Sequence, residues 1–263
     1  MKRILSQSIL NLLLVFFSIG VIIFCGMAAR ADCRYRSGRE TYEKIRLAAR
    51  GGQQASPAAF TVCSQLRNAP GVPDGGQHHF AAIDEGALKK QNADYLFWLY
   101  IPGTEIDYPV VRHEDNQYYL NHTFLREENP CGSIFADSGT VTGVEENTVI
   151  NGHNMRDGSM LGGLKKYEKQ QYFKEHPDLW IYCGGRWVRG RIFSCRIAVD
   201  GNREAYRTCF GPGEKAAYLA AVESESLYDT GIRPGEEDRL VTLSTCRGSR
   251  DKLLVQAVLE EME

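Results

Sequence analysis

Several motifs that mark common enzyme classes are missing from this 263-residue sequence. There is no Cys-x-x-Cys pair, so neither a zinc ribbon nor a thioredoxin-type redox site is indicated. There is no Gly-x-Ser-x-Gly elbow and no His-Glu-x-x-His helix. The sequence therefore indicates neither a serine hydrolase of the α/β type nor a zinc metalloprotease. His78 and His79 are adjacent, but no third ligand lies near them in the sequence. We therefore expect neither a metal nor a cofactor.

The chain also lacks an excess of charge of either sign. It has 31 Lys and Arg residues against 33 Asp and Glu residues, for a net charge of −2. Domains that bind nucleic acid favour a basic face, so we expect no nucleic-acid partner. The hydrophobic share of 43% and the charged share of 24% are ordinary for a globular protein. The length allows one large domain or two small ones.

One stretch near the N-terminus has no charged residue at all. Ser8–Ala29 is a run of 22 residues, and about 20 are enough to span a bilayer. The apolar core of a cleaved signal peptide is shorter, at about 7–15 residues. We therefore expect residues 1–30 to be an uncleaved, single-pass anchor in the cell membrane. Ala29-Arg30-Ala31 also matches the pattern of a processing site, so cleavage is left open.

The charges beside this run do not decide its orientation. Lys2 and Arg3 precede it, and Arg30, Arg34 and Arg36 follow it, so the positive-inside rule is ambiguous.

Residues 31–90 predict a helical region that ends in a linker. Arg39–Arg50 has helical composition, and Gly51–Pro57 breaks it. Pro70–Gly76 carries two prolines and three glycines, which is typical of a loop.

Residues 91–263 are rich in β-type patterns. Short apolar runs alternate with turn signals, as in Phe97–Ile101 followed by a Pro-Gly turn. Leu179–Cys183, Gly184-Gly185 and Arg186–Val188 together predict a hairpin. Glu214–Leu227 is rich in alanine and predicts a helix. Many short strands with few helices indicate a β-barrel or a β-sandwich.

Cysteine chemistry is the most promising source of catalysis. A thiol nucleophile needs a base or a cation nearby, and such partners are usually distant in the sequence. Cys246 ends an apolar run and is followed by Arg247-Gly248-Ser249-Arg250. His153 follows a glycine in a loop, where functional residues tend to lie. The alternatives are that Cys246 is a small buried hydrophobe and that another histidine is used: His113, His122 or His176.

The other cysteines allow two interpretations. The sequence has 8 cysteines, of which Cys25 lies in the apolar run. Without Cys25 and Cys246, an even number is left, which could form disulfides in an oxidising compartment or stay reduced and buried. Both possibilities are left open.

Five blocks of the sequence, in the same order, resemble class B sortases, which are cysteine transpeptidases of Gram-positive cell surfaces. The similarity runs from about Asn92 to about Leu259, and its blocks are Trp98–Val111, Asp115–Phe124, Gly132–Gly139, Asn151–Leu164 and Thr242–Cys246. The resemblance implies a mainly β fold, an eight-stranded sortase barrel over residues 91–263. It also implies N-terminal helices and a helix before the penultimate strand.

The resemblance implies roles for three residues. Cys246 would be the nucleophile, and His153 would carry the proton. Sortases place an arginine on the strand after the cysteine, and here the sequence departs from the family. Counting back from Val255-Gln256-Ala257 puts Lys252 at that position. We choose Arg250, two residues earlier, because only a guanidinium offers two fixed parallel donors.

Further positions match the groove that binds the sorting signal in similar class B enzymes. These are Asn116, Leu120 and Ser244, and Tyr206 is added from an irregular region. Core packing for Leu120 and a plain strand hydroxyl for Ser244 are alternatives.

The resemblance implies a catalytic domain outside the cytoplasm that cleaves the C-terminal sorting signal of surface proteins. A thioester on Cys246 would be resolved by an amino group of a cell-wall precursor or a pilin. The alternatives are a cysteine peptidase that uses water and an inactive barrel that binds surface proteins.

Overall fold

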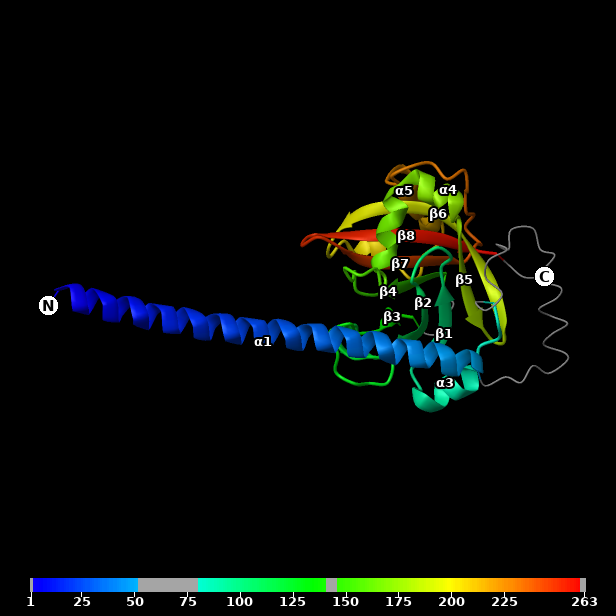
Figure 1. Cartoon of the computed structure of the whole chain (residues 1–263). Helices are drawn as coiled ribbons and strands as arrows, with labels where there is room; N and C mark the ends of the chain where they lie inside the picture. Colours follow the sequence, from blue (N-terminus) through cyan, green and yellow to red (C-terminus); the bar gives the residue numbers. More distant parts are fainter. Residues whose placement is uncertain (1, 52–79, 141–145, 261–263) are drawn as a thin grey trace.

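The computed structural model describes residues 2–51, 80–140 and 146–260, called the described residues below. The chain begins with one long helix, α1 (Lys2–Gly51), and continues after residue 79 to the short helix α3 (Glu85–Gln91). Figure 1 shows α1 as a rod whose C-terminal part lies against the rest of the molecule. The helix passes without a break through the predicted domain boundary at residue 30 and ends where Gly51 was expected to end it.

Within the described residues, eight strands form a closed barrel, which confirms the predicted fold. Their order around the barrel is β1-β2-β3-β4-β7-β8-β6-β5. The strands are β1 (Tyr95–Tyr100), β2 (Asp107–Arg112), β3 (Ile134–Ala136), β4 (Asn147–Asn151), β5 (Asp178–Cys183), β6 (Arg186–Val199), β7 (Leu240–Arg247) and β8 (Asp251–Leu259).

Two neighbouring pairs in this barrel are parallel, β2 with β3 and β4 with β7. Parallel strands cannot be joined by a tight turn, so a long crossover must separate them in the sequence. The short helix η1 (Tyr118–Leu120) lies between β2 and β3, and the crossover from β4 to β7 contains further helices and two strands of the barrel. Its helices are η2 (Gly162–Glu168), α4 (Gln170–Glu175), η3 (Arg203–Tyr206) and α5 (Glu214–Ser224).

The helix and hairpin predictions for this region are confirmed. Helix α5 precedes β7, the penultimate strand. It begins at Glu214 as predicted and ends at Ser224, three residues before the predicted end at Leu227. Strands β5 and β6 form the predicted hairpin, in which Gly184 and Gly185 have φ angles of 61° and 81°. Only glycine adopts such angles without strain, and they match the turn that follows the twist of paired strands.

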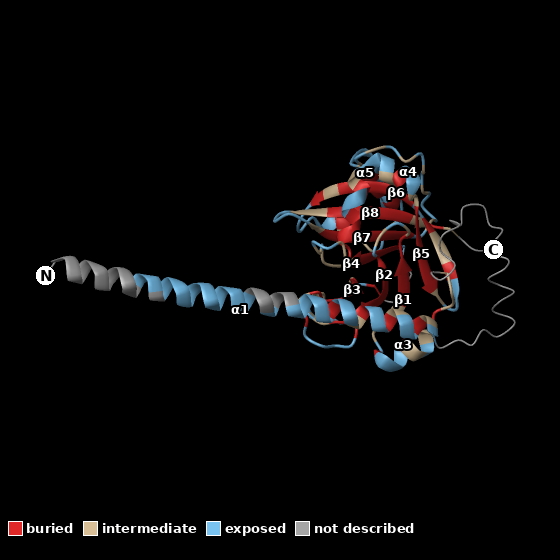
Figure 2. Ribbon diagram, viewed as in Figure 1, coloured by how far each residue is buried: buried red, intermediate tan, exposed pale blue. Residues whose placement is uncertain are grey.

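The C-terminal part of α1 covers the outer face of the barrel at β2. Tyr42, Ile45 and Ala49 recur at helical spacing and are buried in the main core. The ring of Tyr42 packs edge-on against Tyr108 of β2, with 5.2 Å between ring centroids. Figure 2 shows the contrast along the helix, with buried residues where α1 meets the barrel and exposed ones where it extends away.

A buried carboxylate fixes α1 to the barrel. Asp107 begins β2 and is only 6% exposed. Its two oxygens accept hydrogen bonds from the guanidinium of Arg50, at 2.7 and 2.6 Å. The indole Nε1 of Trp98 donates to the same carboxylate at 2.7 Å. Bidentate pairing of this kind is among the strongest polar contacts in proteins, so it holds the helix in one position.

Among the residues that the structure describes, no helix is both long enough and apolar enough to cross a bilayer. The predicted linker, Pro70–Gly76, and the pair His78 and His79 lie outside the described residues.

Replacing Arg50 by Ala should destabilise the fold. The buried carboxylate of Asp107 would lose its cation, and the free energy of unfolding should fall by about 2 kcal/mol. Chemical denaturation followed by tryptophan fluorescence measures this loss, because Trp98 lies at the contact.

Lys44→Ala is the matched control, since Lys44 is a basic residue on the exposed face of the same helix. Its effect should stay within about 0.5 kcal/mol. Equal losses in the two variants would mean that the Arg50–Asp107 contact contributes nothing specific.

Candidate active site

The parallel pairing of β4 with β7 brings two distant segments together. Asn151, the last residue of β4, pairs with Ser244 of β7. The backbone N–H of Gly152 then donates to the carbonyl of Ser244 at 3.2 Å. The carboxyl ends of parallel strands meet at the same edge of a sheet, so the histidine loop after β4 lies beside the end of β7.

Hydrogen bonds on both sides of His153 hold its loop against β7. The side-chain amide of Asn154 donates to the carbonyl of Cys246 at 2.7 Å. The hydroxyl of Thr245 donates to the carbonyl of Gly152 at 2.8 Å. The histidine is therefore bracketed by two residues that are bonded to the cysteine strand.

The imidazole of His153 contacts a third segment of the chain. Its Nε2 lies 2.7 Å from the carbonyl of Leu120, in η1 (Tyr118–Leu120). A carbonyl can only accept, so Nε2 carries a proton in this arrangement. The contact brings His153 and Leu120, both predicted site residues, together.

The thiol of Cys246 faces an ammonium group. Cys246 pairs across the β7–β8 hairpin with Lys252, whose Nζ lies 3.2 Å from Sγ. The thiol is half-buried and is thus open on one side. Nearby positive charge favours the thiolate, which is the reactive form of cysteine.

Ser244 and Tyr206 join the same cluster. Ser244 lies two residues before Cys246 on β7, and residues two apart in a strand share a face. The hydroxyls of Tyr206 and Ser244 are 3.2 Å apart. Burial raises the pKa of the Tyr206 hydroxyl, so it is neutral near neutral pH and can donate or accept a hydrogen bond.

Arg250, the predicted arginine, does not lie where Lys252 lies. It is exposed in the turn between β7 and β8, and its backbone carbonyl accepts from the N–H of Asp200 at 2.9 Å. The guanidinium of Arg247 forms an ion pair with Glu168 of η2 at 3.1 Å. The role predicted for Arg250 stays a prediction, and the geometry favours Lys252.

Asn116 lies in a different network from the thiol. Its amide donates to the carboxylate of Asp137 at 2.7 Å, and its carbonyl oxygen accepts from the N–H of Ser138 at 2.8 Å. These contacts fix the segment after β3, and the predicted role of Asn116 in binding a substrate stays a prediction.

The remaining thiols are poor nucleophiles or lie elsewhere. Burial raises the pKa of Cys131 to about 11 and that of Cys195 to about 12. Within the described residues every cysteine is a free thiol, and Cys63 lies outside them.

Buried polar side chains hold the segment around Tyr206, which forms one wall of the site, against the barrel. Arg196 of β6, Gln256 of β8, Thr242 of β7 and Asn147 of β4 form a continuous chain of hydrogen bonds across four strands. The amide of Asn147 then donates to the carbonyl of Arg207 at 2.6 Å. This last bond ties down the residue after Tyr206, so the chain of contacts holds Tyr206 over Ser244.

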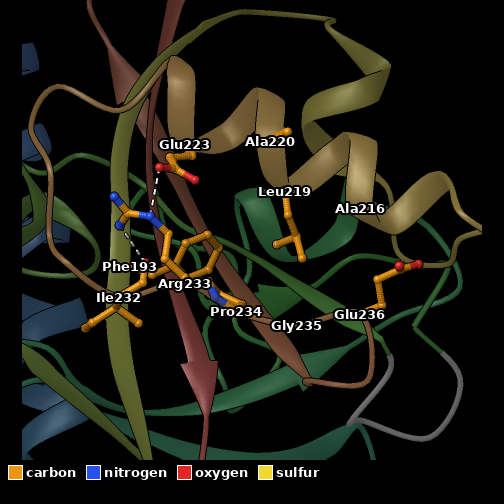
Figure 3. Close-up of a pocket in the computed structure, with 10 residues that line it drawn as sticks. All are labelled: Phe193, Ala216, Leu219, Ala220, Glu223, Ile232, Arg233, Pro234, Gly235 and Glu236. Atoms are coloured by element: carbon orange, nitrogen blue, oxygen red, sulfur yellow. Dashed lines mark hydrogen bonds and ion pairs between the residues drawn. The ribbon is translucent and has the colours of Figure 1, made fainter.

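A separate pocket of about 400 Å³ lies between α5, β6 and the segment before β7. Figure 3 shows its lining, where the guanidinium of Arg233 pairs with the carboxylate of Glu223. None of the predicted site residues lines it. Among the described residues, no group of three or more His, Cys, Asp or Glu side chains is placed to hold a metal ion.

Two residues that hold the site together escaped the sequence prediction, Asn154 and Thr245. Both are adjacent to a predicted catalytic residue, which is a signal that could have found them. Asp200, whose carboxylate lies 3.7 Å from Nζ of Lys252, gave no signal, because only the fold brings it there.

Comparison with known proteins supports one family. A family model described as a sortase domain matches residues 99–260. Sortase B of Listeria monocytogenes is 35% identical over 165 residues, which is 62% of this chain and 67% of that protein.

Solved structures agree with this assignment. Sortase B of Clostridium perfringens is 34% identical with a TM-score of 0.64, covering 67% of this chain and all (100%) of that one. A Staphylococcus aureus sortase B–substrate complex has a TM-score of 0.69 at 24% identity, and the match covers 88% of this chain and 100% of that chain. At this identity the likeness supports the fold alone. The chain therefore belongs to the sortase family and, within it, to the class B sortases.

Proposed function

We propose that this chain is a cysteine transpeptidase that cleaves a C-terminal sorting signal of surface proteins and transfers them to an amino group. Membership in the sortase B family supports transpeptidation as the reaction class. The acceptor would be an amine of a cell-wall precursor or of a pilin.

One observation carries the proposal, the meeting of Cys246 with the histidine loop. The thiol lies beside an ammonium group at 3.2 Å, and the loop of His153 is bonded to the same strand end. A nucleophile beside a cation, with a proton carrier on the adjoining loop, is the arrangement that acyl transfer through cysteine requires.

The proposed reaction has two halves. The thiolate of Cys246 attacks the carbonyl carbon of the scissile peptide bond, and a C–S bond forms. When the tetrahedral intermediate collapses, the C–N bond breaks and protonated His153 gives its proton to the leaving amine. The acceptor amine then attacks the thioester carbon and gives a proton to the now neutral His153. A new C–N bond forms, and the C–S bond breaks to release the thiolate of Cys246.

Substrate binding is proposed at the side chains around the thiol. Ser244 and Tyr206 lie on the same side of β7 as Cys246, and Leu120 lies against His153. Asn116 would act farther along the peptide, since it is bonded to Asp137 and Ser138.

Changing Cys246 to Ala should abolish both cleavage and transfer, because no other thiol of the described residues occupies this site. The measurement is turnover of a library of peptides with C-terminal sorting-type sequences. Cys209→Ala is the control, since Cys209 is an exposed free thiol on the β6–β7 connection, and its activity should be unchanged. Activity retained without Cys246 would refute the nucleophile.

The fate of the intermediate separates the proposal from its alternatives. Single-turnover labelling detected by mass should show a thioester that added hydroxylamine releases faster than water does. Release that added amine does not accelerate would indicate a peptidase. Absence of any adduct would indicate a barrel that only binds surface proteins.

His153→Gln should slow thioester formation by about 100-fold or more, which is the usual contribution of a positioned acid or base. The glutamine keeps a hydrogen-bond donor for Leu120 but cannot carry the proton. His113→Gln, on a half-buried histidine of another segment, should leave the rate unchanged. Similar losses in both variants would exclude a specific role for His153.

We also propose that the N-terminal run anchors the chain in the cell membrane, with the barrel on the outer side. The uncharged run Ser8–Ala29 supports this, as do large apolar side chains of α1 that are exposed. Among them are Phe16 at 63%, Phe17 at 72% and Phe24 at 72% exposure.

Fractionation of cells tests the anchor. The full-length chain should stay with the membranes in high salt and be released by detergent. Changing Leu13 and Phe17 together to Arg should release it, because each buried charge costs about 3 kcal/mol at mid-membrane. Finding the unaltered protein in the medium, with Ala31 or Asp32 as its new N-terminus, would instead show cleavage.

A further inference from the structure

The cation beside the thiol is set by the length of the β7–β8 hairpin. Arg247 pairs with Asp251, so the loop consists of Gly248, Ser249 and Arg250. Gly248 has a φ of 77°, which allows this tight reversal. The next pair toward the strands is Cys246 with Lys252, and side chains directly opposite each other in an antiparallel pair are in contact.

The surroundings of Lys252 keep it charged and in place. Its side chain is 23% exposed, and the carboxylate of Asp200 lies 3.7 Å from Nζ. Burial acts to lower the pKa of Lys252, but the hydrogen bond to Cys246 and the charge of Asp200 raise it above its usual value. An ammonium group in this position is protonated throughout the neutral range.

The other charged groups near the thiol do not compete with Lys252. Arg247 is paired with Glu168, and Arg250 is exposed in the turn. Tyr206 is neutral near neutral pH, because burial raises its pKa. The proton of His153 Nε2 is directed at the carbonyl of Leu120.

We propose that Lys252 is a catalytic residue whose ammonium group holds the thiolate of Cys246 and then the negative charge of the tetrahedral intermediate. The proposal rests on the function proposed above. It gives to a lysine the role that the family resemblance gives to an arginine. Lys252 gives up no proton in the reaction. Negative charge moves from Sγ to the carbonyl oxygen when the C–S bond forms, and passes to the leaving nitrogen when the C–N bond breaks. It returns to Sγ only when the acceptor amine breaks the C–S bond. The leaving amine takes its proton from His153.

Alkylation of Cys246 by iodoacetamide tests the charge pairing without any peptide substrate. The full-length chain is treated, then digested with trypsin, and the peptide Leu240–Arg247 reports Cys246 alone. At pH 7, Lys252→Ala should slow alkylation about tenfold, since an opposite charge at this range strongly favours the thiolate. Lys252→Arg should keep most of the rate. Arg250→Ala tests the residue chosen from the sequence and should change the rate less than twofold.

The pH dependence separates a charge effect from structural damage. At about pH 10 an ordinary thiol is already ionised, so the rates of the unaltered chain and Lys252→Ala should converge. A deficit of equal size at pH 7 and pH 10 would overturn the proposal, because it would show a distorted site. A larger loss of alkylation rate in Arg250→Ala than in Lys252→Ala would also overturn the proposal. It would assign the role of the cation to Arg250.

Turnover of a sorting-type peptide completes the test. If Lys252 also stabilises the intermediate, Lys252→Ala should lower kcat by about 100-fold with little change in KM, and Lys252→Arg should restore part of it. A loss confined to KM would overturn the catalytic role. If the unaltered chain turns over no peptide while alkylation still depends on Lys252, the proposed function fails and the pairing of charge with thiol is upheld.

Discussion

The parallel pairing of β4 with β7 is the contact on which the site depends. A parallel ladder aligns the carboxyl ends of its two strands, so the loop after β4 and the last residues of β7 must lie side by side. His153 and Cys246 are brought together by that rule, and hydrogen bonds from Asn154 and Thr245 lock the result. An antiparallel arrangement of the same strands would place them at opposite ends of the barrel.

The crossover that a parallel pair requires also supplies one wall of the site. Between β4 and β7 the chain forms β5, β6 and α5, and its segment around Tyr206 returns over the outer face of β7. Burying polar groups such as Gln256 and Thr242 is costly unless each has a partner. Here they bond to one another and reach the backbone beside Tyr206, so the buried network orders the wall.

The choice of cation follows from the geometry of one hairpin. A three-residue loop leaves Lys252 directly across from Cys246 and leaves Arg250 in the turn. Lysine is a compact charge on a flexible stem, whereas arginine offers a planar pair of donors. A lysine at this position can match the single charge of a thiolate, although it cannot make a fixed bidentate contact. The carboxylate of Asp200 limits the freedom of its stem.

The sequence by itself determined the fold class, the hairpin at Gly184-Gly185, the helix before the penultimate strand and the segments that carry His153 and Cys246. Local patterns were enough for the β-rich class, the hairpin and the helix, because turn glycines, alternation and helix composition act over a few residues. The resemblance to class B sortases implied the closed barrel and the roles of His153 and Cys246. Only the tertiary structure decided which residues meet. It placed Lys252 rather than Arg250 beside the thiol, and it brought Asp200, Leu120 and Tyr206 to the site from other elements. Counting along the sequence had pointed to Lys252, and Leu120 and Tyr206 were predicted site residues, but their contacts depend on strand register and on the path of a long crossover. Asp200 left no trace in the sequence, because only the fold brings it to Lys252.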